Sequence, residues 1–158
     1  MKKIFVLILT VAIASLYLSY AAENKMPGAD ADELWNYITK DSPYTEWGFW
    51  EDHSGLLPGK APHGPYHKVY VNETLLNAGS VPVPYGSIQV KENYNPSKKK
   101  VAITVMYKVK GFNPDAGDWF WARYTLSGKS GPVGKVQMCI GYHAVKADND
   151  YITIHTIK

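Results

Sequence analysis

The chain has 158 residues, of which 46% are hydrophobic and 20% are charged, and its net charge is +3. This composition is typical of a globular protein and excludes an intrinsically disordered chain. The net charge is too small to indicate nucleic-acid binding, and a single cysteine excludes an intramolecular disulfide.

The first 22 residues are predicted to be a secretory signal peptide. Two lysines precede an apolar run from Ile4 to about Leu18, and small residues follow as far as Ala22. An uncleaved membrane anchor is the alternative, because the apolar run is close to the lower length limit for spanning a bilayer. In both cases the body of the protein would be exported, to the periplasm or the extracellular space. Cleavage would leave about 136 residues, which suits one domain without a membrane anchor.

One helix is predicted near the new N-terminus. Residues 23–46 are interpreted as a short linker followed by this helix, which begins after Asp30 and ends before Pro43. Glu33 lies three residues after Asp30, as in a capping box, and the segment has an apolar side. Together with residues 47–158 this segment is expected to form one globular unit.

Strands are predicted for most of the remaining chain. Residues 47–65 are rich in Gly, Pro, Trp and His without periodicity and are predicted to be an irregular loop, whereas Gly-rich residues 127–135 are predicted to be a surface loop. Between and after them lie alternating β-branched and aromatic runs, at residues 66–72, 87–94, 101–111, 118–126 and 150–157.

The way in which these runs are joined indicates the fold class. The sequence NPSKKK between the second and third runs is a turn signal and predicts an antiparallel hairpin. The runs alternate between apolar and polar residues, unlike the continuously apolar strands of a parallel sheet. The predicted fold is therefore α+β and mainly β, an antiparallel sheet with one or two packed helices.

The only cysteine lies four residues before a histidine. In one helical turn Cys139 and His143 would share a face, as the first thiol and the imidazole do in the c-type haem sequence C-x-x-C-H. Tyr142 replaces the second cysteine and cannot form a thioether. On these residues alone, a buried structural cysteine beside an unrelated histidine is an open alternative. A zinc or copper site is a weaker one, because the other four histidines show no clear ligand spacing.

Four segments of the chain resemble the cytochrome P-460 family, a group of small exported c-type cytochromes. They are HGPYHKVYVNE, VPYGSIQVKENY, ITVMYKVKGFNPDAGDWFWARY and CIGYHAVKADNDY, in the family's order. The resemblance covers residues 47–158 and implies a mainly antiparallel β domain that is often dimeric. It also implies a haem c that is attached through one cysteine only, Cys139, with His143 as the iron ligand.

The resemblance carries expectations for function as well. Characterised relatives oxidise hydroxylamine with nitric oxide, some carry a lysine–haem cross-link, and a sister group, the β-type cytochromes c-prime, binds gases in an apolar distal pocket. By the same resemblance Lys68 matches the cross-linking lysine, with Lys91 as the competitor, and Glu92 matches a distal carboxylate that could relay protons. A carboxylate on the otherwise apolar face of residues 87–94 would lie at a rim or in a pocket.

Two functional hypotheses follow from the sequence. The first is a periplasmic mono-haem protein for redox chemistry on, or binding of, small nitrogen species such as hydroxylamine and nitric oxide. This protein would be a homodimer. It would bind a small-molecule ligand or substrate and exchange electrons with a redox partner protein, and it would not bind nucleic acid. The alternative is a haem-free member of the same fold that serves as a binding or structural module.

Overall fold

A computed structural model describes residues 25–157. The predicted signal peptide therefore lies outside the described residues. Within them, none of the helices has the length and apolar character needed to span a bilayer.

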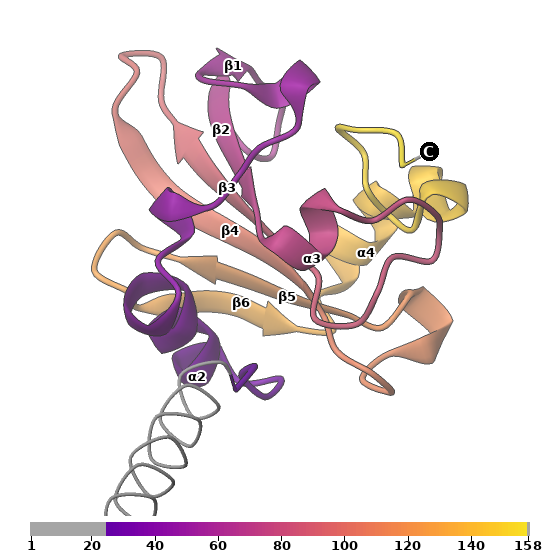
Figure 1. Ribbon diagram of the computed structural model, residues 1–158. Helices are drawn as coiled ribbons and strands as arrows, with labels where there is room; N and C mark the ends of the chain where they lie inside the picture. Colours follow the sequence, from indigo (N-terminus) through magenta and orange to yellow (C-terminus); the bar gives the residue numbers. More distant parts are fainter. Residues whose placement is uncertain (1–24, 158) are drawn as a thin grey trace, which may run out of the picture.

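Six antiparallel strands form one sheet in the order β1-β2-β3-β4-β5-β6, so each strand lies beside its neighbour in the chain. Figure 1 shows the sheet running through the molecule, with the helices at its sides. The mainly β, α+β fold with packed helices is thus confirmed. The strands are Leu57–Pro58 (β1), Tyr66–Val71 (β2), Ile88–Tyr94 (β3), Lys100–Lys108 (β4), Trp119–Tyr124 (β5) and Ser130–Gly134 (β6).

The predicted hairpin at NPSKKK joins β3 to β4, and Val90 pairs with Val105 across it. Because directly opposed residues in an antiparallel sheet lie on the same side, β3 divides cleanly between two faces. Ile88 and Val90 belong to one apolar cluster, and the alternate residues Gln89, Lys91 and Asn93 face the other side.

The N-terminal helix covers the first face of the sheet. Helix α2 (Ala31–Asn36) begins where predicted, because the Asp30 side chain accepts hydrogen bonds from the first-turn backbone. It continues as a π-helical turn, Tyr37–Asp41, before Pro43. Leu34 and Ile38 are fully buried against the residues of β3, β4 and β5 on this face.

The second face is covered by α4 (Gln137–His143) and by the C-terminal segment, which lie across the sheet from α2 in Figure 1. Their residues pack against Val69, Met106 and Trp119 of the sheet. A short helix, α3 (Glu73–Leu76), places Leu75 in the same cluster. The fold therefore has two hydrophobic layers, one on each face of the sheet.

Two element predictions are wrong. Residues 150–157 form no strand, because Asp150 and Tyr151 adopt left-handed backbone conformations with φ of 52° and 65°. The Asn149 side chain then bonds the backbone of Ile152, His155 and Ile157, which occupies groups that a strand ladder would use. Conversely, residues 127–135 do not form a loop throughout, because β6 pairs with β5 after a tight turn.

Candidate functional site: a cavity between the sheet and the Cys139 helix

A cavity of about 400 Å³ lies between the second face of the sheet and α4. This volume is within the range of small-molecule sites. Cys139, Tyr142 and His143 line it from α4, and Gln89, Lys91 and Asn93 line it from β3. Its other walls come mainly from β4, β5 and the loop before β2, through residues that include His63, Thr104, Met106, Trp121 and Arg123.

Cys139 and His143 share the cavity because a single helix carries both. They are the third and last residues of α4, and four residues apart they lie on one side of it. Cys139 is half-buried, and burial raises the pKa of its thiol. The cysteine therefore remains a protonated thiol near neutral pH, and addition of its S–H bond across a carbon–carbon double bond would give a thioether.

His143 is oriented by the backbone. Its Nδ1 lies 2.8 Å from the carbonyl oxygen of Tyr151. A carbonyl oxygen can only accept a hydrogen bond, so Nδ1 must carry the proton and Nε2 holds the lone pair. Burial lowers the pKa of His143, the bond to Tyr151 opposes this shift, and Lys91 adds to it. The side chain is thus a neutral imidazole with Nε2 available, which is the form that binds a metal.

Tyr142 lies at the opening of the cavity. Its side chain is 44% exposed, and its ring centroid is 5.6 Å from that of His143. A residue exposed to this extent does not fill the interior. Tyr142 cannot form a thioether, and at this position it does not close the cavity.

Polar atoms without partners mark the cavity as a place for a ligand. Gln89 Oε1, Asn93 Oδ1 and Trp121 Nε1 are buried and make no hydrogen bond within the described part of the chain. All three residues line the cavity. Leaving such atoms unpaired is costly, so a bound group or water is expected to satisfy them. Together with the His143 imidazole, these atoms fit a group that has both apolar surface and polar substituents, as haem does.

Lys91 is the lysine of the cavity. Its side chain is 6% exposed, and burial lowers the pKa of its amine to about 8. Among the residues that the structure describes, the amine has no hydrogen-bond or ion-pair partner. A buried, unpaired amine that titrates near neutral pH is uncommon outside functional sites.

The structure does not bring Lys68 and Glu92 to the cavity. Lys68 pairs with Glu92 across β2 and β3, and Glu92 pairs with Ile103, which belongs to the apolar cluster under α2. Both residues therefore lie on the opposite face of the sheet from Cys139 and His143. Of the residues expected at the site, Cys139 and His143 lie together there, as does the competing lysine, Lys91.

Glu92 is buried in a polar network of its own. Its carboxylate accepts hydrogen bonds from Tyr44 at 2.8 Å, Tyr94 at 2.7 Å and Lys100 at 2.6 Å. Burial alone would raise its pKa, but these three bonds outweigh burial and hold the pKa below its usual value of 4.5. Through these hydrogen bonds Glu92 links β3 to Tyr44 and, through Lys100, to β4.

Replacing Glu92 by glutamine is expected to lower the free energy of unfolding by about 2 kcal/mol at pH 7, because three donors lose a charged acceptor. Because the pKa of Glu92 is lower in the folded state, its carboxylate stabilises the fold at any pH above the unfolded-state pKa of 4.5. This contribution is lost as the pH falls through the folded-state pKa. The difference between parent and variant in urea unfolding should therefore shrink in acid. The exposed Glu46→Gln variant is the control, and an equal loss there would contradict the role of the network.

Metal binding by histidine alone has no structural support. The described residues contain no group of three His, Cys, Asp or Glu side chains placed to hold a metal ion. His63 lies 3.3 Å from Thr104 Oγ1 at the cavity, whereas His67 stacks on His53 with ring centroids 6.0 Å apart. The side chains of His63 and His67 thus diverge.

Apart from Lys91, the residues that line the cavity from the sheet were not anticipated from the sequence, although one signal could have found Gln89 and Asn93. Gln89, Lys91 and Asn93 alternate with Ile88, Val90 and Glu92, and all six are buried. Three successive polar side chains on one face of a buried strand indicate a lined cavity. Trp121 and Met106 carry no comparable signal, because aromatic and thioether side chains are equally common in cores.

Comparison with known proteins agrees with the geometry. The family model for Cytochrome P-460 matches residues 43–154. No curated protein matches the chain. The matched span includes every residue that lines the cavity.

Proposed function

Because the chain belongs to the cytochrome P-460 family, we propose that it is an exported mono-haem protein that acts on small nitrogen species. The family is one of haem proteins. In this proposal Cys139 forms the single thioether and His143 binds the iron through Nε2. The observation that carries it is the hydrogen bond from His143 Nδ1 to Tyr151, because it presents Nε2 as an acceptor on a residue of the cavity.

Bound haem would supply electron transfer and a site for a small ligand on the iron. The protein's own part is to hold that group, to exclude water and to provide a proton carrier. Trp121 and Met106 offer apolar surface on the sheet side, while Gln89 and Asn93 offer unpaired polar atoms. Histidine ligation with one thioether is expected to hold the group, since the iron bond and burial both contribute.

A few polar side chains in an otherwise mostly apolar cavity favour a polar substrate over passive gas storage. Lys91, Asn93 and His63 line it, whereas a gas-binding pocket needs only apolar walls. Oxidation of hydroxylamine releases protons as well as electrons, and an amine with a pKa of about 8 can exchange protons near neutral pH. We assign this proton transfer to Lys91 in place of Glu92. We also expect Lys91, and not Lys68, to be the lysine that any haem cross-link uses.

The test of haem attachment is production with the c-type maturation system, followed by an intact mass and a reduced absorption spectrum. The parent chain is expected to carry one haem by mass and to show a Soret band. Cys139→Ser should lose the covalent mass, because no other thiol is present in the sequence. A bare polypeptide mass without a Soret band in the parent would overturn the haem proposal and favour the haem-free binding module.

Tyr142→Cys is the matched control for this experiment. The substitution restores C-x-x-C-H at an exposed position of α4, so it should leave the fold intact and add a second thioether. If the Tyr142→Cys variant takes up haem and the parent chain does not, Tyr142 is the reason why the parent lacks haem. Lys68→Ala and Lys91→Ala then separate the two lysines, since only the one that forms a cross-link changes the mass and spectrum of the haem-loaded protein.

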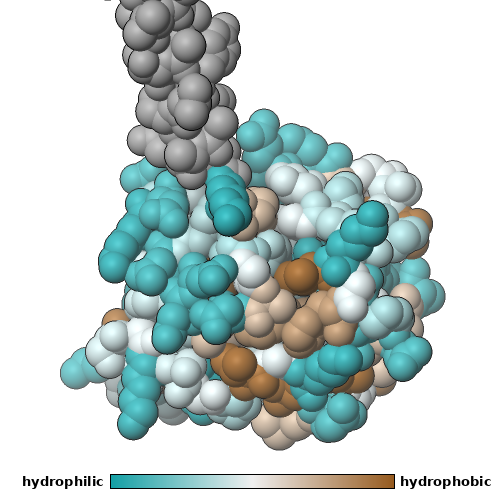
Figure 2. Space-filling model, turned by 90° about the horizontal axis from the view of Figure 1, so that it is seen from below, coloured by the Kyte–Doolittle hydropathy of each residue, from teal (hydrophilic) through white to brown (hydrophobic). Residues whose placement is uncertain are grey.

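A homodimer is proposed as the acting form. Hydrophobic residues gather in a patch among hydrophilic ones on the face shown in Figure 2. Contiguous exposed apolar patches are common at protein contact sites. Sedimentation at increasing protein concentration is expected to show association into dimers, and a monomer at all concentrations would refute it.

A further inference from the structure

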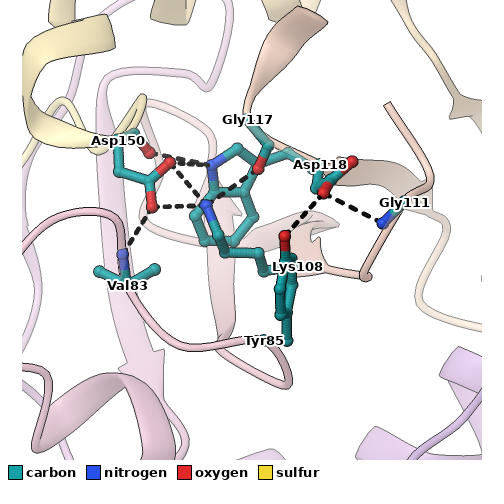
Figure 3. A network of polar contacts seen from close by, with 8 residues as sticks. Val83, Tyr85, Lys108, Gly111, Gly117, Asp118 and Asp150 are labelled. Atoms are coloured by element: carbon teal, nitrogen blue, oxygen red, sulfur yellow. Dashed lines mark hydrogen bonds and ion pairs between the residues drawn. The ribbon is translucent and has the colours of Figure 1, made fainter. Parts of the chain in front are cut away.

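A buried ion pair joins β4 to the chain that follows α4. Lys108 Nζ lies 2.7 and 2.5 Å from the two carboxylate oxygens of Asp150, and both side chains are about 5% exposed. Figure 3 shows Lys108 reaching both Asp150 and the Gly117 carbonyl, while the Val83 amide donates to the same carboxylate. The charges of the pair are thus enclosed and bonded on several sides.

The backbone at Asp150 is held as firmly as its side chain. Trp119 Nε1 donates to the Asp150 carbonyl oxygen at 2.9 Å. Asp150 and Tyr151 both have positive φ, at 52° and 65°. Two consecutive non-glycine residues in this region are unfavourable, and such a conformation persists only where the surroundings determine it. The contacts of Asp150 are those surroundings.

The turn made by these two residues delivers the carbonyl group that orients His143. The Tyr151 oxygen lies 2.8 Å from His143 Nδ1, and the Tyr151 amide donates to the Lys146 carbonyl at 2.8 Å. The peptide group of Tyr151 therefore depends on the turn at Asp150, one residue earlier. A continuous series of contacts leads from Lys108 through Asp150 and Tyr151 to His143.

We propose that the Lys108–Asp150 pair is a positioning pair for His143. It holds the left-handed turn that keeps the Tyr151 carbonyl at Nδ1, and so selects the tautomer in which Nε2 is free. The importance of Nε2 as an iron ligand rests on the proposed function, but the selection of the tautomer is a property of the polypeptide itself. Loss of the group that hydrogen-bonds a metal-binding histidine commonly changes metal affinity by about 10- to 100-fold, and here that group is the Tyr151 carbonyl.

The experiment uses Asp150→Asn in the full chain, produced without haem maturation and labelled with nitrogen-15. Asparagine tolerates positive φ, so the substitution removes the charge without changing the backbone preference. In the parent at neutral pH, the ring-nitrogen chemical shifts of His143 should show the Nδ1–H tautomer. In the variant we expect the ratio of Nε2–H to Nδ1–H to rise by up to about tenfold, the change that the loss of one hydrogen bond produces.

Asp118→Asn is the control for general destabilisation. Asp118 is buried to a similar degree, also has a positive φ of 59°, and lies in the same network in Figure 3. Its carboxylate accepts hydrogen bonds from the Tyr85 hydroxyl and from the Gly111 and Asn113 amides, and none from the turn at Asp150. Asp118→Asn should lower the thermal midpoint without moving the His143 shifts.

The double variant Lys108→Met/Asp150→Asn covers the case in which Asp150→Asn alone fails to fold, because it leaves no unpaired charge. A folded protein that lacks the pair but keeps the parental tautomer overturns the proposal, as does an equal tautomer shift in Asp118→Asn. Because the measurement is made without haem, a failure of haem attachment leaves its outcome unaffected.

Discussion

Replacing Lys108 by methionine is expected to lower the free energy of unfolding by about 3–5 kcal/mol, the largest loss expected for a single substitution here. The substitution leaves the Asp150 carboxylate buried without its cation, and only the hydrogen bonds from Trp119 Nε1 at 3.3 Å and from the Val83 amide at 2.7 Å then remain to the charge. Urea unfolding at pH 7 measures the loss.

The double variant Lys108→Met/Asp150→Asn distinguishes the cost of an unpaired charge from the contribution of the pair itself. Replacing a buried pair by neutral residues of similar volume is often close to neutral, so more than half of the loss should be recovered. Equal instability of the single and double variants would mean that Lys108 contributes through packing, for instance over the Trp119 ring 5.0 Å away.

Replacing Lys91 by methionine is expected to stabilise the haem-free chain at neutral pH by up to about 3 kcal/mol. Burial lowers the pKa of the amine from 10.5 to about 8. The folded state therefore binds this proton less tightly than the unfolded state does. Below pH 8 the folded protein bears the full cost of the buried charge, and this cost disappears as the pH rises to 10.5.

Urea unfolding of parent and Lys91→Met at pH 7 and pH 10.5 provides the measurement. The variant should be more stable at the lower pH and similar to the parent at the higher one. Lys68→Met is the control, because Lys68 lies outside the cavity on the opposite face and should show no such dependence. A stability difference that does not vary with pH would contradict the burial of a charged amine.

Lys91 is therefore a residue that the fold retains at a cost to its stability. Such residues are concentrated at functional sites, where activity and stability conflict. The proposed role of Lys91 as a proton carrier would account for this cost. The same reasoning does not apply to Glu92, whose three hydrogen bonds give it a stabilising role.

Local patterns were sufficient for most of the fold. Period-two alternation located β2, β3, β4 and β5, and the turn residues at NPSKKK identified the β3–β4 hairpin. These predictions succeeded because each depends on contacts between residues that are near in the chain. Residues 150–157 have the same alternation but form no strand, since Asp150 and Tyr151 are held in a turn by residues far away in the sequence.

By itself the sequence determined the family resemblance and the mainly β fold. It also determined that Cys139 and His143 lie on the same side of one helix, because their i, i+4 spacing is a local property. Only the tertiary structure decided which lysine lines the same cavity as these two residues. Lys91 and Glu92 are adjacent, and the pleat of β3 sends them to opposite faces. Which face receives α4, and so forms the cavity, depends on the packing of α4 against Val69, Met106 and Trp119, which come from three different strands.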